Sequence, residues 1–150
     1  MMRDAIKKML IAEEDIRPSP YDCKTGKAVL APVGKVTIGV GRNLIDNPLS
    51  EEEIFFLLDN DITRIWTAAV EMFPGYSDWK QGRQLALLNM IFQLGVGGVC
   101  NFRDMLECID RGDWDGAARE VLDSDLARND TPARARRVSE MFRTGEHPYG

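Results

Sequence analysis

The stretch from 51 to 72 contains neither glycine nor proline, and it limits the possible folds more than any other part of the chain. At the start of this stretch, Ser50 and Glu53 have the spacing of a capping box. In a capping box, each of the two side chains accepts a hydrogen bond from a backbone amide at the helix start. A Pro-Gly pair at 74–75 would end the helix. The sequence therefore predicts one long helix over about 51–72.

The N-terminal third shows two different periods. Residues 3–14 have helical spacing, and the period becomes two over 20–42, which predicts a β-hairpin. Pro18 and Pro20 separate the two segments. The apolar stripe of the helix is formed by Met2, Ile6, Met9 and Leu10.

The alternation is clearest in "KVTIGVGR", residues 35–42. One face of this strand would carry Val36, Ile38 and Val40, and the other would carry Thr37, Gly39 and Gly41. The glycines permit bulges in a half-buried strand. Small residues on the Thr37 face would also leave room for a ligand against the backbone.

After the long helix the chain remains helical. Ser77 would open a helix whose centre, "LALLNMIFQLG", is apolar nearly all round and hence buried, and glycines from Gly95 onward would end it. Short helices are expected at about 102–110 and 113–123. A last helix is expected to begin at Thr131-Pro132 and to end at Gly145.

These elements predict a single α+β domain, mainly α, over residues 1–150. A small β-hairpin lobe (about 16–50) and a larger helical lobe (1–15 and about 73–150) would be joined by the long helix. Two lobes of unequal size would leave a cleft between them, where ligands bind preferentially.

Composition excludes several classes of function. A net charge of −5 disfavours a nucleic-acid binder. No apolar run is long enough for a membrane anchor, and the N-terminus lacks a secretory signal, so we expect a cytoplasmic start. The three cysteines and one histidine lack zinc-motif spacing, so no metal is expected. Cys100 and Cys108 are expected to be small buried hydrophobes.

Glu14 is a candidate general acid. On a helical wheel it lies at the edge of the apolar stripe, where partial removal from water favours the protonated carboxyl. Glu13 falls nearer the middle of the stripe. Most glutamates at a charged helix end are plain surface residues, and the pattern alone does not select Glu14 over Glu13.

Five ordered strings resemble the T-even phage lysozymes, endolysins that cleave bacterial peptidoglycan. These strings are "MLIAEEDIRPSPY", "TIGVGRNL", "NMIFQLGVGGV", "RGDWDGAARE" and "TPARARRVSEMFRTG". The resemblance spans nearly the whole chain. It implies a β-lobe and a helical lobe with the active site between them, in agreement with the elements above.

The resemblance also implies catalytic residues. The family pattern is a glutamate, eight residues, an aspartate or sometimes a cysteine, five residues, and a threonine before Ile-Gly-x-Gly. Glu14, Cys23 and Thr37 match it, with thirteen residues instead of five before Thr37, which an extended hairpin would absorb. Asp22 is the alternative to Cys23, because a carboxylate is ionised at neutral pH whereas a thiol is mostly neutral.

Further positions are implied in the same way. Arg134 matches a family arginine close to the catalytic glutamate, where it would hold that side chain in place. Phe92 and Gln93 match a segment lining the saccharide cleft, although an aromatic residue there could equally belong to the core. Arg42 replaces a common family histidine, and Arg137 is expected to be structural.

The function expected from the resemblance is a muramidase. It would hydrolyse the β-1,4 bond between N-acetylmuramic acid and N-acetylglucosamine with inversion, without a cofactor, and would lyse the host of a phage. Such a monomeric enzyme would stay in the host cytoplasm until a holin permeabilised the inner membrane. Two alternatives are a lytic transglycosylase on the same substrate and a catalytically inactive peptidoglycan-binding protein.

Overall fold

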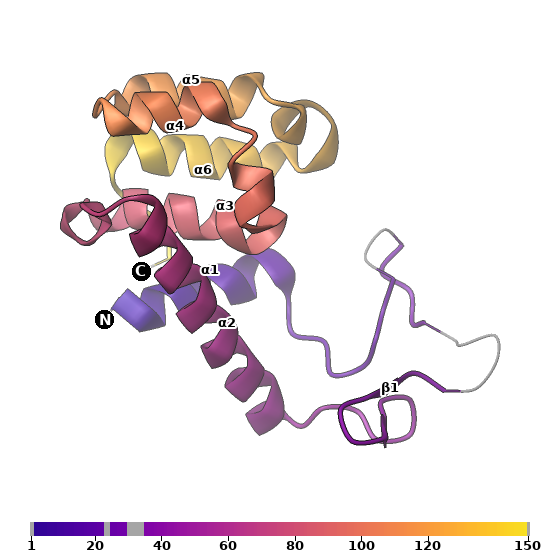
Figure 1. Cartoon of the computed structure of the whole chain (residues 1–150). Helices are drawn as coiled ribbons and strands as arrows, with labels where there is room; N and C mark the ends of the chain where they lie inside the picture. Colours follow the sequence, from indigo (N-terminus) through magenta and orange to yellow (C-terminus); the bar gives the residue numbers. More distant parts are fainter. Residues whose placement is uncertain (1, 23–24, 30–34, 150) are drawn as a thin grey trace.

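The computed structural model describes residues 2–22, 25–29 and 35–149. The chain is mainly helical, with a two-stranded antiparallel sheet (Figure 1). The elements are α1 (Met2–Glu14), β1 (Thr37–Ile38), β2 (Arg42–Asn43), α2 (Glu51–Met72), the 3-10 turn η1 (Tyr76–Asp78), α3 (Gln81–Val99), α4 (Arg103–Asp110), α5 (Trp114–Asp123), the π turn η2 (Leu126–Asp130) and α6 (Pro132–Thr144).

The long helix predicted over 51–72 is confirmed, together with its cap. Ser50 accepts a hydrogen bond from the Glu53 amide, and the Glu53 carboxylate accepts one from the Ser50 amide. In Figure 1, α2 runs from the group of helices towards the small sheet. Its C-terminal half packs on α3, and its buried residues are Ile62, Ile65 and Ala69.

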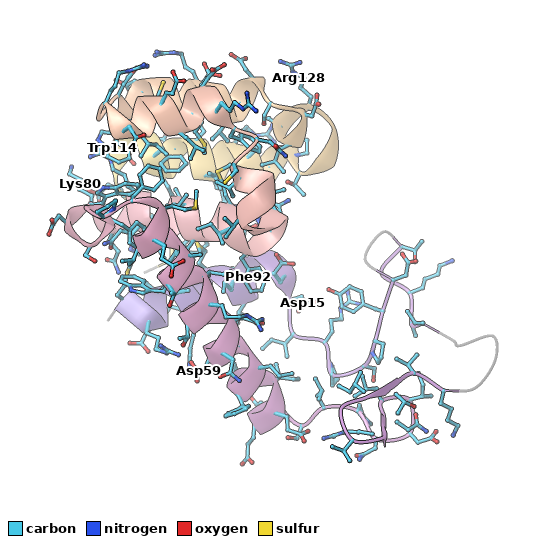
Figure 2. The ribbon with its side chains drawn as sticks, viewed as in Figure 1. Asp15, Asp59, Lys80, Phe92, Trp114 and Arg128 are labelled. Carbon is cyan, nitrogen blue, oxygen red and sulfur yellow. The ribbon has the colours of Figure 1, made fainter. Side chains whose placement is uncertain are left out.

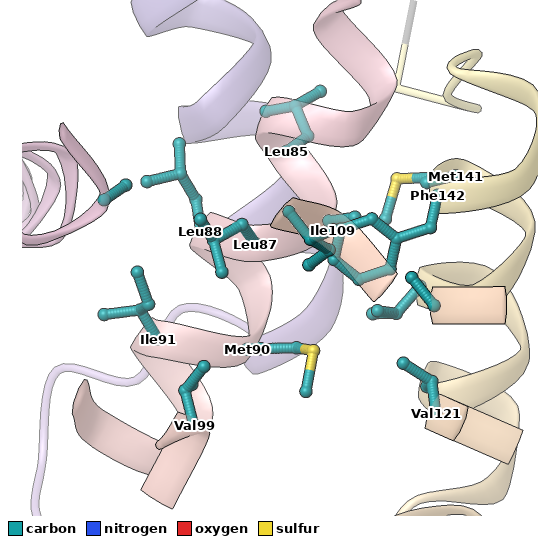
Figure 3. Packing of buried hydrophobic residues seen from close by; sticks show 14 of the residues in the cluster. Leu85, Leu87, Leu88, Met90, Ile91, Val99, Ile109, Val121, Met141 and Phe142 are labelled. Atoms are coloured by element: carbon teal, nitrogen blue, oxygen red, sulfur yellow. The ribbon is translucent and has the colours of Figure 1, made fainter. Parts of the chain in front are cut away.

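Helix α3 lies at the centre of the hydrophobic core. Every residue from Gln84 to Ile91 is buried, as expected for a helix that is apolar nearly all round. Figure 3 shows side chains of α3, including Leu85 and Met90, packing towards Met141 and Phe142 of α6. Gly82 lies so close to the Gly145 backbone that an added Cβ would come within 2.4 Å of it. This junction fixes the start of α3 against the end of α6.

The strand predicted over 36–40, in an antiparallel hairpin, is confirmed only in part. Thr37 and Ile38 pair with Asn43 and Arg42, and residues 39–41 form a turn. Gly39 and Gly41 have φ values of 55° and 73°, in the left-handed region that glycine adopts at little cost. The glycines therefore mark a reversal of the chain, and the expected alternation of faces ends at Ile38.

Three smaller expectations also need correction. The helix expected to open at Ser77 begins at Gln81, after the 3-10 turn. Gly95 breaks the regular backbone of α3 at φ 69° and ψ 167°, yet helical residues continue to Val99. Cys108 is buried as expected, whereas Cys100 is exposed.

No single helix among the described residues has both the length and the apolar character needed to cross a membrane. Helices α3 and α4 reach that threshold only when they are counted together, and they are bent by 112° relative to each other.

Candidate functional site

Glu14 is the last residue of α1, and its side chain is 37% exposed. It lines a pocket of about 300 Å³. The apolar part of the wall includes Leu10, Ile16, Tyr21, Leu49, Ile54, Leu58 and Phe92. In Figure 2, Asp15 and Phe92 mark the region in which the chain leaves α1. The pocket thus combines the carboxyls of Glu14, Asp15 and Asp61 with a largely apolar wall, and an apolar wall with a few polar groups is typical of a ligand site.

A larger hollow of about 440 Å³ lies between the end of α3, α4 and the end of α5. It contains none of the residues that the sequence predicts for the site. The smaller pocket is therefore the better candidate, because it holds the predicted acid.

Arg134 on α6 is 7% exposed and connects Glu14 to the core. Its Nη1 donates to Glu14 Oε1 at 2.5 Å, and its Nε donates to Oδ1 of Asn89 on α3 at 2.6 Å. The carboxyl, the guanidinium and the amide therefore join three helices. Within the described part of the chain, Arg134 Nη2 and Asn89 Nδ2 are buried and have no acceptor.

Glu13 has different surroundings, although it is adjacent in sequence. Its side chain is 3% exposed and accepts hydrogen bonds from three donors. Arg137 Nε and Nη2 donate at 2.8 and 2.5 Å, and the Tyr149 hydroxyl donates at 2.7 Å. Burial raises the pKa of Glu13, but the hydrogen bonds from Arg137 and Tyr149 together outweigh it, so the pKa lies below its usual value. Glu13 is thus a buried anion, and Glu14 is the carboxyl that reaches the pocket.

The two predicted cleft residues on α3 have different environments. Phe92 lines the pocket together with Glu14. Gln93 donates through Nε2 to Thr131 Oγ1 at 2.9 Å. The Thr131 hydroxyl therefore accepts a hydrogen bond from α3 and makes no capping hydrogen bond to α6. Pro132 begins the helix as predicted.

The middle catalytic position falls near a tight turn. Asp22 Oδ1 accepts a hydrogen bond from the Thr25 amide at 2.9 Å. The Asp22 amide and carbonyl pair with Lys27 O and Gly26 N at 2.8 Å each. Tyr21 lines the Glu14 pocket, whereas Asp22 does not. Cys23 lies outside the described residues.

Thr37 is not brought into the Glu14 pocket. It is exposed on β1, and its hydroxyl donates to Lys35 O at 3.0 Å. Arg42, on the neighbouring strand, forms an ion pair with Glu53 and donates to the Pro48 carbonyl at 2.6 Å. This arginine therefore fastens the small sheet to the start of α2.

Sequence reasoning missed two parts of the site. Asn89 is a single amide within the apolar stretch "LALLNMIFQLG", and a buried polar group of this kind needs a partner, which was the available signal. Tyr149 had no such signal, because its partner Glu13 is 136 positions away. No set of three or more side chains suited to hold a metal ion occurs in the described ranges.

Comparison with known proteins relates this arrangement to one family. The family model described as Phage lysozyme matches residues 12–139. The pre-baseplate central spike protein Gp5 of Enterobacteria phage T4 is 37% identical over 117 residues, which cover 74% of this chain and 20% of that protein. The probable T4-type lysozyme 1 of Dictyostelium discoideum is 33% identical over 100 residues, covering 64% of this chain and 56% of the relative.

The chain thus spans less than two thirds of the length of each of these relatives. The family match nevertheless extends from the end of α1 into α6, so it includes both Glu14 and Arg134. The chain belongs to the phage lysozyme family of glycoside hydrolases.

Proposed function

We propose that this chain hydrolyses the β-1,4 bond between N-acetylmuramic acid and N-acetylglucosamine in bacterial peptidoglycan, with Glu14 as the general acid. The observation that carries the proposal is the position of Glu14 at a largely apolar pocket, within the part of the chain that matches the phage lysozyme family. No cofactor takes part in the proposed reaction.

The glycan strand would lie between the helical part and residues 16–50. The pocket wall supports this placement. Helices α1, α2 and α3 contribute Leu10, Leu58 and Phe92 to it, and the segment that follows α1 contributes Ile16 and Tyr21. An extended polymer with alternating sugar faces suits such an open, mostly apolar hollow.

The chemistry follows from the cleavage of a glycoside. Protonated Glu14 gives its proton to the leaving oxygen as the bond to the anomeric carbon opens towards an oxocarbenium-like transition state. Water then attacks that carbon from the opposite face and loses a proton, which inverts the configuration. Arg134 holds the Glu14 side chain in position. Cys23 and Thr37 remain the proposed groups for the attacking water, by their place in the family pattern.

Substitution of the acid tests the proposal. Glu14→Gln keeps the shape of the side chain and removes the proton donor, so clearance of permeabilised Gram-negative cells should fall by at least about 10²-fold. The circular-dichroism melt should change little. Glu140→Gln is the matched control, because Glu140 lies on the exposed side of α6, where it pairs with Arg143. Persistent clearance by Glu14→Gln would refute the assignment, and absence of clearance by the unaltered chain would favour a binding protein.

A lytic transglycosylase is the second candidate. In that reaction the 6-hydroxyl of the muramic acid residue attacks its own anomeric carbon, so no activated water is needed. The observation favouring it is that Asp22, the carboxylate beside the middle position, is engaged by its own turn. Mass spectrometry of the released muropeptides distinguishes the two reactions, because only the transglycosylase gives the 1,6-anhydro product.

The biological setting remains a proposal of the same kind. As an endolysin, the chain would act as a monomer, accumulate in the host cytoplasm and reach the wall after a holin opened the inner membrane. The similarity to a phage central spike protein favours a second setting, within a phage particle. Detection of the chain in purified phage particles separates these settings, because only a component of the particle should copurify with it.

A further inference from the structure

Two consecutive carboxylates at the end of α1 lie against one buried guanidinium. Arg134 Nη1 is 2.5 Å from Glu14 Oε1, and Arg134 Nε is 4.0 Å from Glu13 Oε2. The Arg134 side chain is 8% exposed. Water therefore screens these charges weakly. A change in the charge of one carboxylate should alter the electrostatic potential at the other.

Glu13 is held in this position by two other side chains, Arg137 and Tyr149. Arg137 forms a bidentate ion pair with Glu13, and the hydrogen bonds to the Glu13 carboxylate raise the pKa of Arg137. Burial, followed by the hydrogen bond to Glu13, raises the pKa of Tyr149 to about 12, so the phenol is a neutral donor at physiological pH. Glu13 thus keeps its negative charge and its place while Arg134 is shared.

Several other charged and titratable groups lie near Glu14. On α6, Arg134 contacts Glu14 whereas Arg137 contacts Glu13, and α3 contributes the neutral Asn89, which binds Arg134. The remaining titratable groups, in the lining of the Glu14 pocket, are Asp15, Arg17, Tyr21 and Asp61. Asp15 pairs with Arg17, and Asp61 pairs with Arg64, so these carboxylates already have cationic partners. Arg134 is the cation in direct contact with Glu14.

A general acid must hold a proton, and a cation in contact with it opposes this. An anion beside the same cation reduces that opposition, because it offsets part of the positive potential and attracts the guanidinium to itself. We propose that Glu13, held by Arg137 and Tyr149, is a positioning residue for the reaction, since it shares Arg134 with Glu14 and limits the pull of Arg134 on the proton-donating carboxyl. This inference rests on the proposed glycosidase function.

The pH–activity profile tests the proposal, because its alkaline limb reports loss of the proton from the general acid. Glu13→Gln leaves Arg134 to Glu14 alone, so the limb should move to lower pH by about one unit. Arg137→Gln leaves Glu13 to attract Arg134, so the limb should move to higher pH. Tyr149→Phe should give a smaller shift in the same direction as Arg137→Gln.

Matched controls come from the exposed side of α6. Glu140→Gln and Arg143→Gln make the same chemical changes in a surface pair that does not contact Glu14, and neither should move the limb. Thermal melts at each pH show that the compared proteins are folded. If Glu13→Gln does not fold, the upward shifts of Arg137→Gln and Tyr149→Phe decide the question.

A purely structural role for Glu13 would change stability without opposite shifts. The inference would be overturned if the alkaline limb of the pH–activity profile stayed in place in both variants, or moved in the same direction for Glu13→Gln and Arg137→Gln. This conclusion requires that Glu14→Gln abolishes clearance. Continued clearance by Glu14→Gln would instead overturn the proposed function itself.

Discussion

The Asp22 carboxylate accepts a hydrogen bond from the Thr25 amide, and the Asp22 main-chain carbonyl accepts one from the Gly26 amide. Aspartate is common at this place in turns, because its short side chain binds the backbone a few residues ahead. An oxygen used in this way is less available to a reacting water. The family spacing points instead to Cys23.

We therefore expect Asp22→Ala and Cys23→Ala to differ in a lysis assay. Asp22→Ala should retain most of the clearance activity and weaken the backbone contacts of residue 22 with Thr25 and Gly26, whereas Cys23→Ala should lower activity without changing the melt. Cys23→Ser is the control that keeps a hydrogen-bonding group at position 23. A large loss with Asp22→Ala and none with Cys23→Ala would assign the position to the aspartate.

The sequence predicted which residue types matter at this site better than it predicted their partners. The helical wheel placed Glu13 nearer the centre of the apolar stripe than Glu14, and their side chains are 3% and 37% exposed. Arg134 was expected near Glu14 and contacts it. The Tyr149 contact with Glu13 could not be predicted, since a hydrogen bond between distant positions leaves no local pattern.

Among the elements, α2 is the one with the most complete set of N-terminal contacts. Ser50 and Glu53 satisfy each other's amides, and Glu53 also binds Arg42 of β2. The same carboxylate thus begins the helix and fastens the small sheet to it. Loss of the cap should therefore affect both elements.

Ser50→Ala removes the acceptor for the Glu53 amide, and we expect the free energy of unfolding to fall by about 1 kcal/mol. Urea denaturation followed by circular dichroism measures the change. Ser77→Ala is a suitable control, because that exposed side chain makes no capping contact and should stay within about 0.5 kcal/mol of the unaltered chain. Equal destabilisation by the two substitutions would contradict the role given to Ser50.

Local signals predicted the helices more accurately than the strands. The capping box and the Pro-Gly pair gave the ends of α2, because both act within a few residues. The period of two around Thr37 was misleading, since Gly39 and Gly41 reverse the chain after Ile38. A two-residue strand is too short to show a period, so its extent depends on backbone conformations that glycine leaves open.

For the whole molecule, the core is unevenly distributed. The cluster of buried apolar side chains has members in α1 and from Ile62 onward, and none of its members lies in the described residues 15–22, 25–29 and 35–50. Segments with few buried apolar contacts open at a lower free energy than the global unfolding reaction. The described residues between 15 and 50 should therefore open independently of α3.

Hydrogen exchange under native conditions should show this difference. Amides over 35–50 should exchange at least about 100-fold faster than those of α3, where opening requires nearly global unfolding. Exchange resolved by residue provides the measurement, and α6 is an internal control that should behave like α3. Similar protection over 35–50 and α3 would contradict the uneven distribution of stability.

Glu14 and its partner Arg134 are separated by 120 positions, and Glu13 and Tyr149 by 136. A ribosome adds about 5–20 residues per second towards the C-terminus, so Glu14, the proposed proton donor, is synthesised well before the residues that hold it. An unfinished chain would carry Glu14 without the guanidinium that positions it. The contact between Glu14 and Arg134 can thus form only on molecules whose translation has passed α6.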